Sequence, residues 1–382
     1  MSTIPFSLPY LTGKEASYVQ EALESGQWSG DGAFSKKCVG ILEQLTGKRV
    51  FLTPSGTSAL ELSLMALDLR PGDEVLLPSY TFVSSANAAV QMGLVPVFID
   101  IRPDTLNIDE ALIEQAVSPK TRALMVVHYA GVAAEMDAIK SMAAKFNLAV
   151  IEDAAHGVNA FYKGKALGSL GDLGAFSFHQ TKNYSSGEGG AIVVANEKYL
   201  ERVEIHRQKG TDRSKFLMGA VDKYSWVDRG SNYLLSNLLS AVLYAQLENL
   251  EDINSKRKAV CEYYQAGLAD LSDHLLVPSV PSSCRSNYHL FYFLLKDPAS
   301  QTALLSFLKK AGIEATTHFV PLHDSPGGKR FGVTRGPMTI TEKTAKGLVR
   351  LPLYPQLTQD SQKYILGRLK AFFSSHEIGV RS

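Results

Sequence analysis

The sequence contains Ala123-Leu-Met-Val-Val127, then the amphipathic stretch Met136–Phe146, then Leu148-Ala-Val-Ile-Glu152. Runs that are apolar almost throughout are typical of strands buried on both faces of a sheet. Two strands joined through a helix are usually parallel, because the helix returns the chain to the starting edge of the sheet. This stretch therefore predicts an α/β fold.

The same alternation extends from about residue 49 to residue 196 and predicts seven strands. They are expected at Arg49–Leu52, Glu74–Leu77, Val95–Asp100, Ala123–Val127, Leu148–Glu152, Gly174–Phe178 and Ala191–Val194. We expect a mostly parallel sheet in a large domain at residues 1–250. Ligands of such sheets bind beyond the carboxyl ends of the strands.

Residues 251–382 alternate shorter strand and helix patterns, which predicts a smaller α+β domain. Ser236–Leu268 has a long apolar helical face and is expected to form one helix that bridges the two domains. A strand is expected at Ile313–Phe319. The Gly- and Pro-rich stretch Asp324–Gly336 is expected to form a surface loop.

The composition is that of an ordinary globular protein and argues against several classes of partner. The chain has 382 residues and a net charge of +1, which gives no reason to expect nucleic acid or an anionic membrane as a partner. Cys38, Cys261 and Cys284 are widely spaced and odd in number, which disfavours a disulfide framework or a zinc cluster. No signal peptide is recognised, and no apolar stretch approaches the ~20 residues that cross a bilayer. We expect a cytoplasmic protein.

Lys182 and Asp153 are the residues most indicative of chemistry. Lys182 follows a short apolar run in Gly174-Ala-Phe-Ser-Phe-His-Gln-Thr-Lys-Asn-Tyr184, and Asp153 ends the run that begins at Leu148. Pyridoxal 5'-phosphate requires such a pair: an amine that condenses with its aldehyde, and a carboxylate that keeps its pyridine nitrogen protonated. The pair indicates a chain that moves amino groups.

A phosphate site is predicted where Thr53-Pro-Ser-Gly-Thr-Ser-Ala-Leu60 leaves a strand and opens a helix. Gly56 permits close approach to the backbone, and the first-turn amides of a helix attract anions. Ser177 could add a hydroxyl to the same phosphate. The alternatives are an ordinary capped helix and a strand serine without a ligand.

Four further side chains are candidates for the site. Phe82 follows a strand end and could stack on a flat ring, or it could be a core aromatic. His156 could donate to a ring hydroxyl, or it could be structural. Tyr184 and His318 are candidate substrate contacts, and Tyr184 could equally be a core or interface tyrosine. No carboxylate or cysteine near His318 completes a ligand set, so no metal site is predicted.

The chain resembles the DegT/DnrJ/EryC1/StrS family of sugar aminotransferases, which have the aspartate-aminotransferase fold (fold type I). The resemblance rests on motifs spread over nearly the whole chain. These are Gly30–Gly32, Ser55–Thr57, Pro71–Val75, Thr81–Phe82, His128–Gly131, Glu152–His156, Ser177–Asn183, Glu188–Gly190 and Gly230–Tyr233.

The resemblance implies roles for the residues around the pyridoxal ring. Lys182 matches the lysine to which the cofactor is attached, and Asp153 matches the partner of the pyridinium nitrogen. His156 matches the contact to the ring hydroxyl. Phe82 matches the aromatic residue that stacks on the ring.

The resemblance also implies the phosphate contacts and the assembly. Gly56, Thr57 and Ser177 match residues that bind the cofactor phosphate. Asn232 matches an asparagine that reaches the phosphate from the other subunit, which implies a homodimer with shared active sites. Leu234 departs from the family, where an arginine often stands at that position.

The implied activity is amino-group transfer from glutamate to a nucleotide-linked oxo sugar. Lys209–Arg213 and Asp222–Trp226 resemble members that aminate dTDP-4-oxo-6-deoxy-D-glucose, an activity that serves cell-surface polysaccharides. Amination of a 3-oxo sugar and a non-enzymatic, cofactor-binding regulator are the alternatives. A nicotinamide-dependent oxidoreductase is disfavoured, because no strand is followed by Gly-x-Gly-x-x-Gly.

Overall fold

The computed structural model describes residues 3–380 and is built around an eight-stranded sheet. The strand order is β1-β9-β8-β5-β4-β2-β3-β13. The strands are β1 Arg49–Thr53, β2 Glu74–Pro78, β3 Val95–Ile99, β4 Thr121–Val127, β5 Ala149–Asp153, β8 Leu173–Ser177, β9 Gly190–Val194 and β13 Val333–Thr334. Within this sheet β9 runs antiparallel to its neighbours and the other pairings are parallel. The α/β prediction is confirmed, and all seven predicted strands are present.

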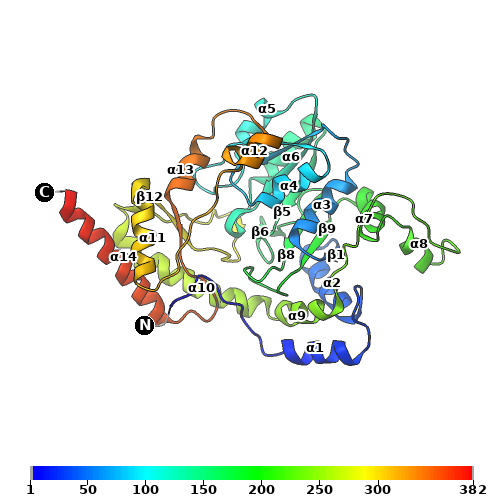
Figure 1. The fold of residues 1–382 in the computed structure, drawn as a ribbon, viewed down its shortest axis with the longest axis horizontal. Helices are drawn as coiled ribbons and strands as arrows, with labels where there is room; N and C mark the ends of the chain where they lie inside the picture. The colour runs from blue at the N-terminus through cyan, green and yellow to red at the C-terminus, as the bar shows by residue number, and fades with distance from the viewer. Residues whose placement is uncertain (1–2, 381–382) are drawn as a thin grey trace.

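Helices cover both faces of the sheet, as its apolar strands require (Figure 1). Successive residues of a strand point to opposite faces of the sheet and belong to two separate hydrophobic cores. Val150 packs with the helices of one face and Ile151 with those of the other. The first face is covered by α2 Ala33–Thr46, α6 Met136–Phe146 and α9 Asn237–Leu247. The second is covered by α3 Gly56–Ala66, α4 Val83–Gln91 and α7 Leu200–Arg207.

A second, smaller sheet lies in the C-terminal part of the chain, with strand order β10-β12-β14. Its strands are β10 Leu275–Leu276, β12 Tyr292–Leu295 and β14 Leu348–Arg350. The helices that pack around it are α10 Leu250–Gly267, α11 Gln301–Lys310 and α14 Gln359–Val380. These elements lie together at one end of the molecule, near both chain termini (Figure 1).

The prediction of a single bridging helix at Ser236–Leu268 is wrong. The chain forms α9 and α10, which are separated at Glu248 and Asn249 and follow one another along one side of the molecule (Figure 1). Asn249 leaves the helical region, with φ −117° and ψ 26°, and its side-chain amide donates to the carbonyl of Ala245 at 2.8 Å. Such local side-chain bonds compete with the helical backbone ladder.

Two further predictions in the C-terminal part are corrected. Ile313–Phe319 forms no strand and pairs only through isolated bridges, Ile313 with Ile4 and Thr316 with Arg350, because no continuous neighbouring strand runs beside it. The predicted loop Asp324–Gly336 contains the short helix α12 Pro326–Phe331 and strand β13. Strand β13 extends because it pairs in parallel with β3 at the edge of the large sheet.

Along residues 3–380, no helix combines the length and the hydropathy that a membrane crossing requires.

Candidate active site

A cavity of about 410 Å³ lies at the carboxyl ends of the parallel strands of the large sheet. Strands β5 and β8 are parallel neighbours and end at Asp153 and Ser177, so both side chains reach the same edge. Eight of the residues predicted from the sequence line this cavity. They are Gly56, Thr57, Phe82, Asp153, His156, Ser177, Lys182 and His318.

Lys182 lies in the tight turn that follows β8, where its backbone N–H donates to the carbonyl of His179 at 2.8 Å. Burial, assisted by the nearby charge of Arg350, lowers the pKa of Lys182 to about 8, although the carboxylate of Asp153 opposes this shift. At this pKa roughly a tenth of the lysine is an uncharged nucleophile at pH 7, and about half at pH 8.

Asp153 is a buried carboxylate whose position is fixed by hydrogen bonds. Its Oδ2 accepts from the hydroxyl of Ser85 at 2.6 Å, and its Oδ1 accepts from the backbone N–H of Ala155 at 3.2 Å. The Ser85 hydroxyl is in turn 2.9 Å from that of Thr81. A carboxylate held in this way is suited to face a pyridinium nitrogen.

The start of α3 forms a narrow cradle beside the end of β8. Ser55 caps the helix by accepting from the backbone N–H of Ser58 at 3.0 Å. A Cβ added to Gly56 would lie 2.9 Å from the Cβ of Ser177, so these two segments approach as closely as only glycine permits. The hydroxyl of Thr57 lies 2.7 Å from that of Ser84, at the start of α4. Two helix starts and a serine hydroxyl thus converge where a phosphate would bind.

The amine, the fixed carboxylate and the cradle share one cavity, so these residues fit pyridoxal phosphate. Phe82 lines this cavity and has 59% of its surface exposed, so its ring is free to stack on one face of a bound aromatic ring. Among residues 3–380 no group of three or more His, Cys, Asp or Glu side chains could hold a metal ion.

Three histidine rings form a row along the cavity wall. The ring centroids of His156 and His289 are 4.1 Å apart, and His156 and His318 are parallel at 6.4 Å. Burial and the charge of Lys182 hold the pKa of both His156 and His289 well below the usual range, so these rings are neutral. Nδ1 of His156 accepts from the backbone N–H of Ala130 at 3.3 Å, which leaves its proton on Nε2.

His289 and Arg350 also line the cavity and were missed by the sequence analysis. Nδ1 of His289 is 2.8 Å from Oδ1 of Asn183, and the amide of Asn183 donates to the carbonyl of Asn287 at 2.7 Å. Both missed residues stand in or beside apolar strand patterns of the C-terminal part. A polar side chain in such a run was the available signal, but nothing local shows that β12 and β14 lie near Lys182.

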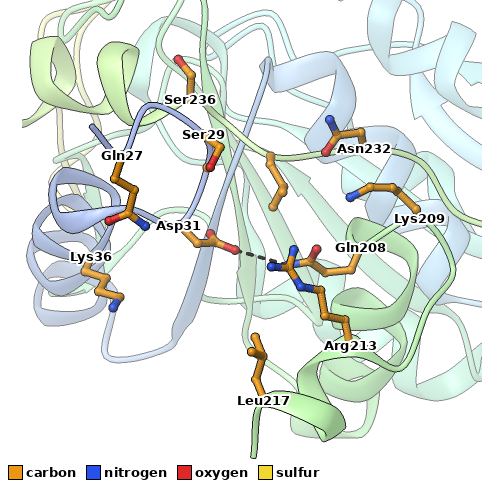
Figure 2. Close-up of a pocket in the computed structure, with 12 residues that line it drawn as sticks. Gln27, Ser29, Asp31, Lys36, Gln208, Lys209, Arg213, Leu217, Asn232 and Ser236 are labelled. Carbon is orange, nitrogen blue, oxygen red and sulfur yellow. Dashed lines mark hydrogen bonds between the residues drawn. The ribbon is translucent and has the colours of Figure 1, made fainter. Parts of the chain in front are cut away.

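Asn232 is not among the residues that line this cavity. It lines a separate pocket of about 610 Å³, which Figure 2 shows with Asp31, Gln208, Lys209 and Arg213 around it. The amide of Gln208 donates to Asp31 at 3.3 Å, and Leu234 lies on the same wall.

Tyr184 is buried in the core of the large domain, with 1% of its surface exposed. Its hydroxyl donates to the carbonyl of Leu250 at 3.2 Å and lies 3.4 Å from the amide of Asn159. Its side chain is therefore occupied by contacts within the protein, and it does not line the cavity of about 410 Å³.

Comparisons with known proteins agree with this geometry. A model of the DegT/DnrJ/EryC1/StrS aminotransferase family matches residues 9–370. An uncharacterized protein of Methanocaldococcus jannaschii is 32% identical over 98% of this chain and 99% of its own length.

Two solved structures have the same fold. The aminotransferase PseC of Helicobacter pylori, involved in the biosynthesis of pseudoaminic acid, superposes with a TM-score of 0.91 at 25% identity, covering 98% of this chain and 100% of that one. A candidate sugar aminotransferase of Streptococcus pneumoniae in its pyridoxal-phosphate form superposes with a TM-score of 0.88 at 26% identity, covering 97% and 98% of the two chains.

The lowered pKa of Lys182 can be tested in cofactor-free protein. Cyanate attacks only uncharged amines, so carbamylation of Lys182 should reach half its maximal rate near pH 8. Peptide mass spectrometry after timed labelling measures this rate, and Lys182→Arg is the control that removes the labelled site. A midpoint near the ordinary lysine value of 10.5 would contradict the burial and charge argument.

Proposed function

Because the chain belongs to the DegT/DnrJ/EryC1/StrS aminotransferase family, we propose that it transfers an amino group from glutamate to the 4-oxo group of a dTDP-4-oxo-6-deoxyhexose. The chain is a pyridoxal-phosphate-dependent sugar aminotransferase. The product would be a dTDP-4-amino-4,6-dideoxyhexose for cell-surface polysaccharide. The observation that carries the proposal is the meeting of Lys182, Asp153 and the Gly56–Ser177 cradle in one cavity.

Several residues would hold the cofactor in that cavity. The helix start at Gly56 and Thr57, with Ser177, would bind its phosphate, and Asp153 would keep its ring nitrogen protonated. When bound, pyridoxal phosphate supplies an aromatic ring that accepts the electron pair released as a donor amino acid loses a proton. Phe82 would cover one face of that ring.

Lys182 is the residue that we propose to move protons. Its Nζ, uncharged in part near neutral pH, would take a proton from the α-carbon of the amino acid and return it at a neighbouring position. Its place in a tight turn would hold the amine close to a bound cofactor, and this would lower the entropic cost of the transfer. His156, with its proton on Nε2, would donate to the ring hydroxyl without adding a charge.

The choice of a dTDP-linked 4-oxo sugar is supported by sequence motifs, Lys209–Arg213 and Asp222–Trp226, that resemble those of enzymes acting on this substrate. His318 lines the cavity and would contact the sugar.

A cytoplasmic location is part of the proposal, because Cys38, Cys261 and Cys284 are free thiols. The domain division into residues 1–250 and 251–382 is likewise proposed.

We also propose a homodimer with shared active sites. The separate pocket around Asn232 is lined by Lys36, Lys209 and Arg213 together with the single carboxylate of Asp31 (Figure 2). In a two-fold dimer the same surface of each subunit can face the cavity of the other. Asn232 would then reach the cofactor phosphate bound in the partner.

The substrate assignment can be tested directly. Protein loaded with pyridoxal phosphate should convert dTDP-4-oxo-6-deoxyglucose and glutamate into a 4-amino sugar and 2-oxoglutarate. NMR coupling constants of the product identify the aminated carbon and its configuration. Turnover of a 3-oxo substrate alone, or no turnover of either sugar, would refute the 4-oxo assignment.

The shared site can be tested by subunit exchange. Lys182→Ala should be inactive and Asn232→Ala should bind the cofactor more weakly. After mixing at equal concentration, about half of the dimers should be mixed, and one of the two sites in each mixed dimer has both residues. About a quarter of all sites should therefore be intact. Activity in the mixture reports this recovery, and a mixture of two differently tagged Lys182→Ala proteins is the control. Absence of recovery despite demonstrated exchange would argue against a shared site.

A further inference from the structure

Arg350 is a buried cation that has no acidic partner among residues 3–380. It stands at the end of β14, lines the cavity around Lys182 and has 9% of its surface exposed. No Asp or Glu pairs with it in the described part of the chain, and its Nε is buried without any hydrogen-bond partner. An isolated buried charge is costly unless a partner supplies compensation.

His318 orients this guanidinium without neutralising it. Nη1 of Arg350 donates to Nε2 of His318, because a guanidinium has no acceptor atom. The proton of His318 therefore lies on Nδ1, which is 3.2 Å from the hydroxyl of Tyr129. Burial, with the charge of Arg350, lowers the pKa of His318 to about 2, so this contact is made to a neutral ring.

The N-terminal segment covers the other side of Arg350. The guanidinium carbon lies 4.5 Å from the centroid of the Phe6 ring, which also lines the cavity. Phe6 is held in place because its backbone N–H donates to the carboxylate of Glu314 at 3.0 Å, and Ile4 forms a bridge with Ile313. The guanidinium is thus pre-positioned between an aromatic ring and a neutral imidazole.

We propose that Arg350 binds a carboxylate of the amino-acid donor when that donor enters the cavity of Lys182. This inference rests on the proposed function, because it assigns a binding role within the same site. The planar fork of a guanidinium matches a carboxylate, and Arg350 lines the cavity without being bound to any carboxylate among residues 3–380.

The surroundings of Arg350 favour a carboxylate over the diphosphate of a nucleotide sugar. Lys182 and Arg350 are the two lysine or arginine side chains in the cavity lining, and Lys182 is needed for the chemistry. Arg350 donates to the neutral His318 and lies over the ring of Phe6, and the nearby groups that act on its charge are the phenols of Tyr80 and Tyr129. One fixed cation compensates one carboxylate, whereas a diphosphate requires several donors.

The proposal can be tested with the cofactor-loaded enzyme by calorimetry. The probes are glutarate, a dicarboxylate that lacks the reacting amine, and thymidine diphosphate. Arg350→Gln should weaken glutarate binding by about 10- to 100-fold, the loss expected for a charge-assisted hydrogen bond, and leave thymidine diphosphate binding unchanged. Arg330→Gln, at an exposed arginine on α12, is the matched control and should alter neither affinity.

Three outcomes would overturn the proposal. Unchanged glutarate binding by Arg350→Gln would remove the carboxylate site, and a loss confined to thymidine diphosphate would make Arg350 a diphosphate contact. Arg350→Lys provides a second variant if Arg350→Gln does not fold, as judged by circular dichroism. Arg350→Lys retains the charge without the planar fork. It should lose less affinity for glutarate than Arg350→Gln and more than Arg330→Gln. Wild-type affinity of Arg350→Lys for glutarate would contradict a role for the planar fork.

The half-reactions separate this inference from the proposed function. Arg350→Gln should slow the spectral change caused by glutamate and leave the reverse change, caused by the oxo sugar nucleotide, unaffected. If the wild-type enzyme reacts with glutamate but with no dTDP sugar, the substrate assignment fails while the role of Arg350 is still tested. Equal rates with glutamate for Arg350→Gln and the wild type would refute that role.

Discussion

The site depends on the buried carboxylate of Glu152, next to the end of β5. Its two oxygens accept from the backbone N–H groups of Gly168 at 2.8 Å and of Leu170 and Gly171 at 2.6 Å. Nε2 of His128 lies 2.8 Å away and carries the proton, because its Nδ1 accepts from the N–H of Ala134. Each hydrogen bond to a charged group contributes about 1.5–3 kcal/mol, so Glu152 binds the end of β5 firmly to the segment that leads into β8.

The adjacent carboxylates of Glu152 and Asp153 therefore have different roles, one structural and one in the cavity. Strand geometry points successive side chains to opposite faces, so Glu152 faces the connection before β8 while Asp153 faces Ser85 and the cavity. Gly174 allows the close packing that this requires, since a Cβ there would lie 2.1 Å from the carbonyl oxygen of Gly168. The register that places Asp153 beside Ala175 also brings Ser177 and the turn of Lys182 to the same edge.

Much of this arrangement could be predicted from the sequence, because the large domain consists of local patterns. Apolar runs predicted every long strand of the sheet. Asp153 and Ser177 end two of these strands and Lys182 follows the second, so a parallel sheet brings all three to one edge. The missed features depend on distant contacts. Strand β13 is extended only by its pairing with β3, and Arg350 reaches the cavity only because β14 packs beside β12.

The most direct test of the account is to identify the lysine that carries the cofactor. Protein incubated with pyridoxal phosphate is reduced with borohydride, digested and analysed by peptide mass spectrometry. We expect the pyridoxyl group on the peptide containing Lys182, and we expect no such group in Lys182→Ala. Attachment to a different lysine, or no specific attachment, would contradict the assignment of this cavity as the active site.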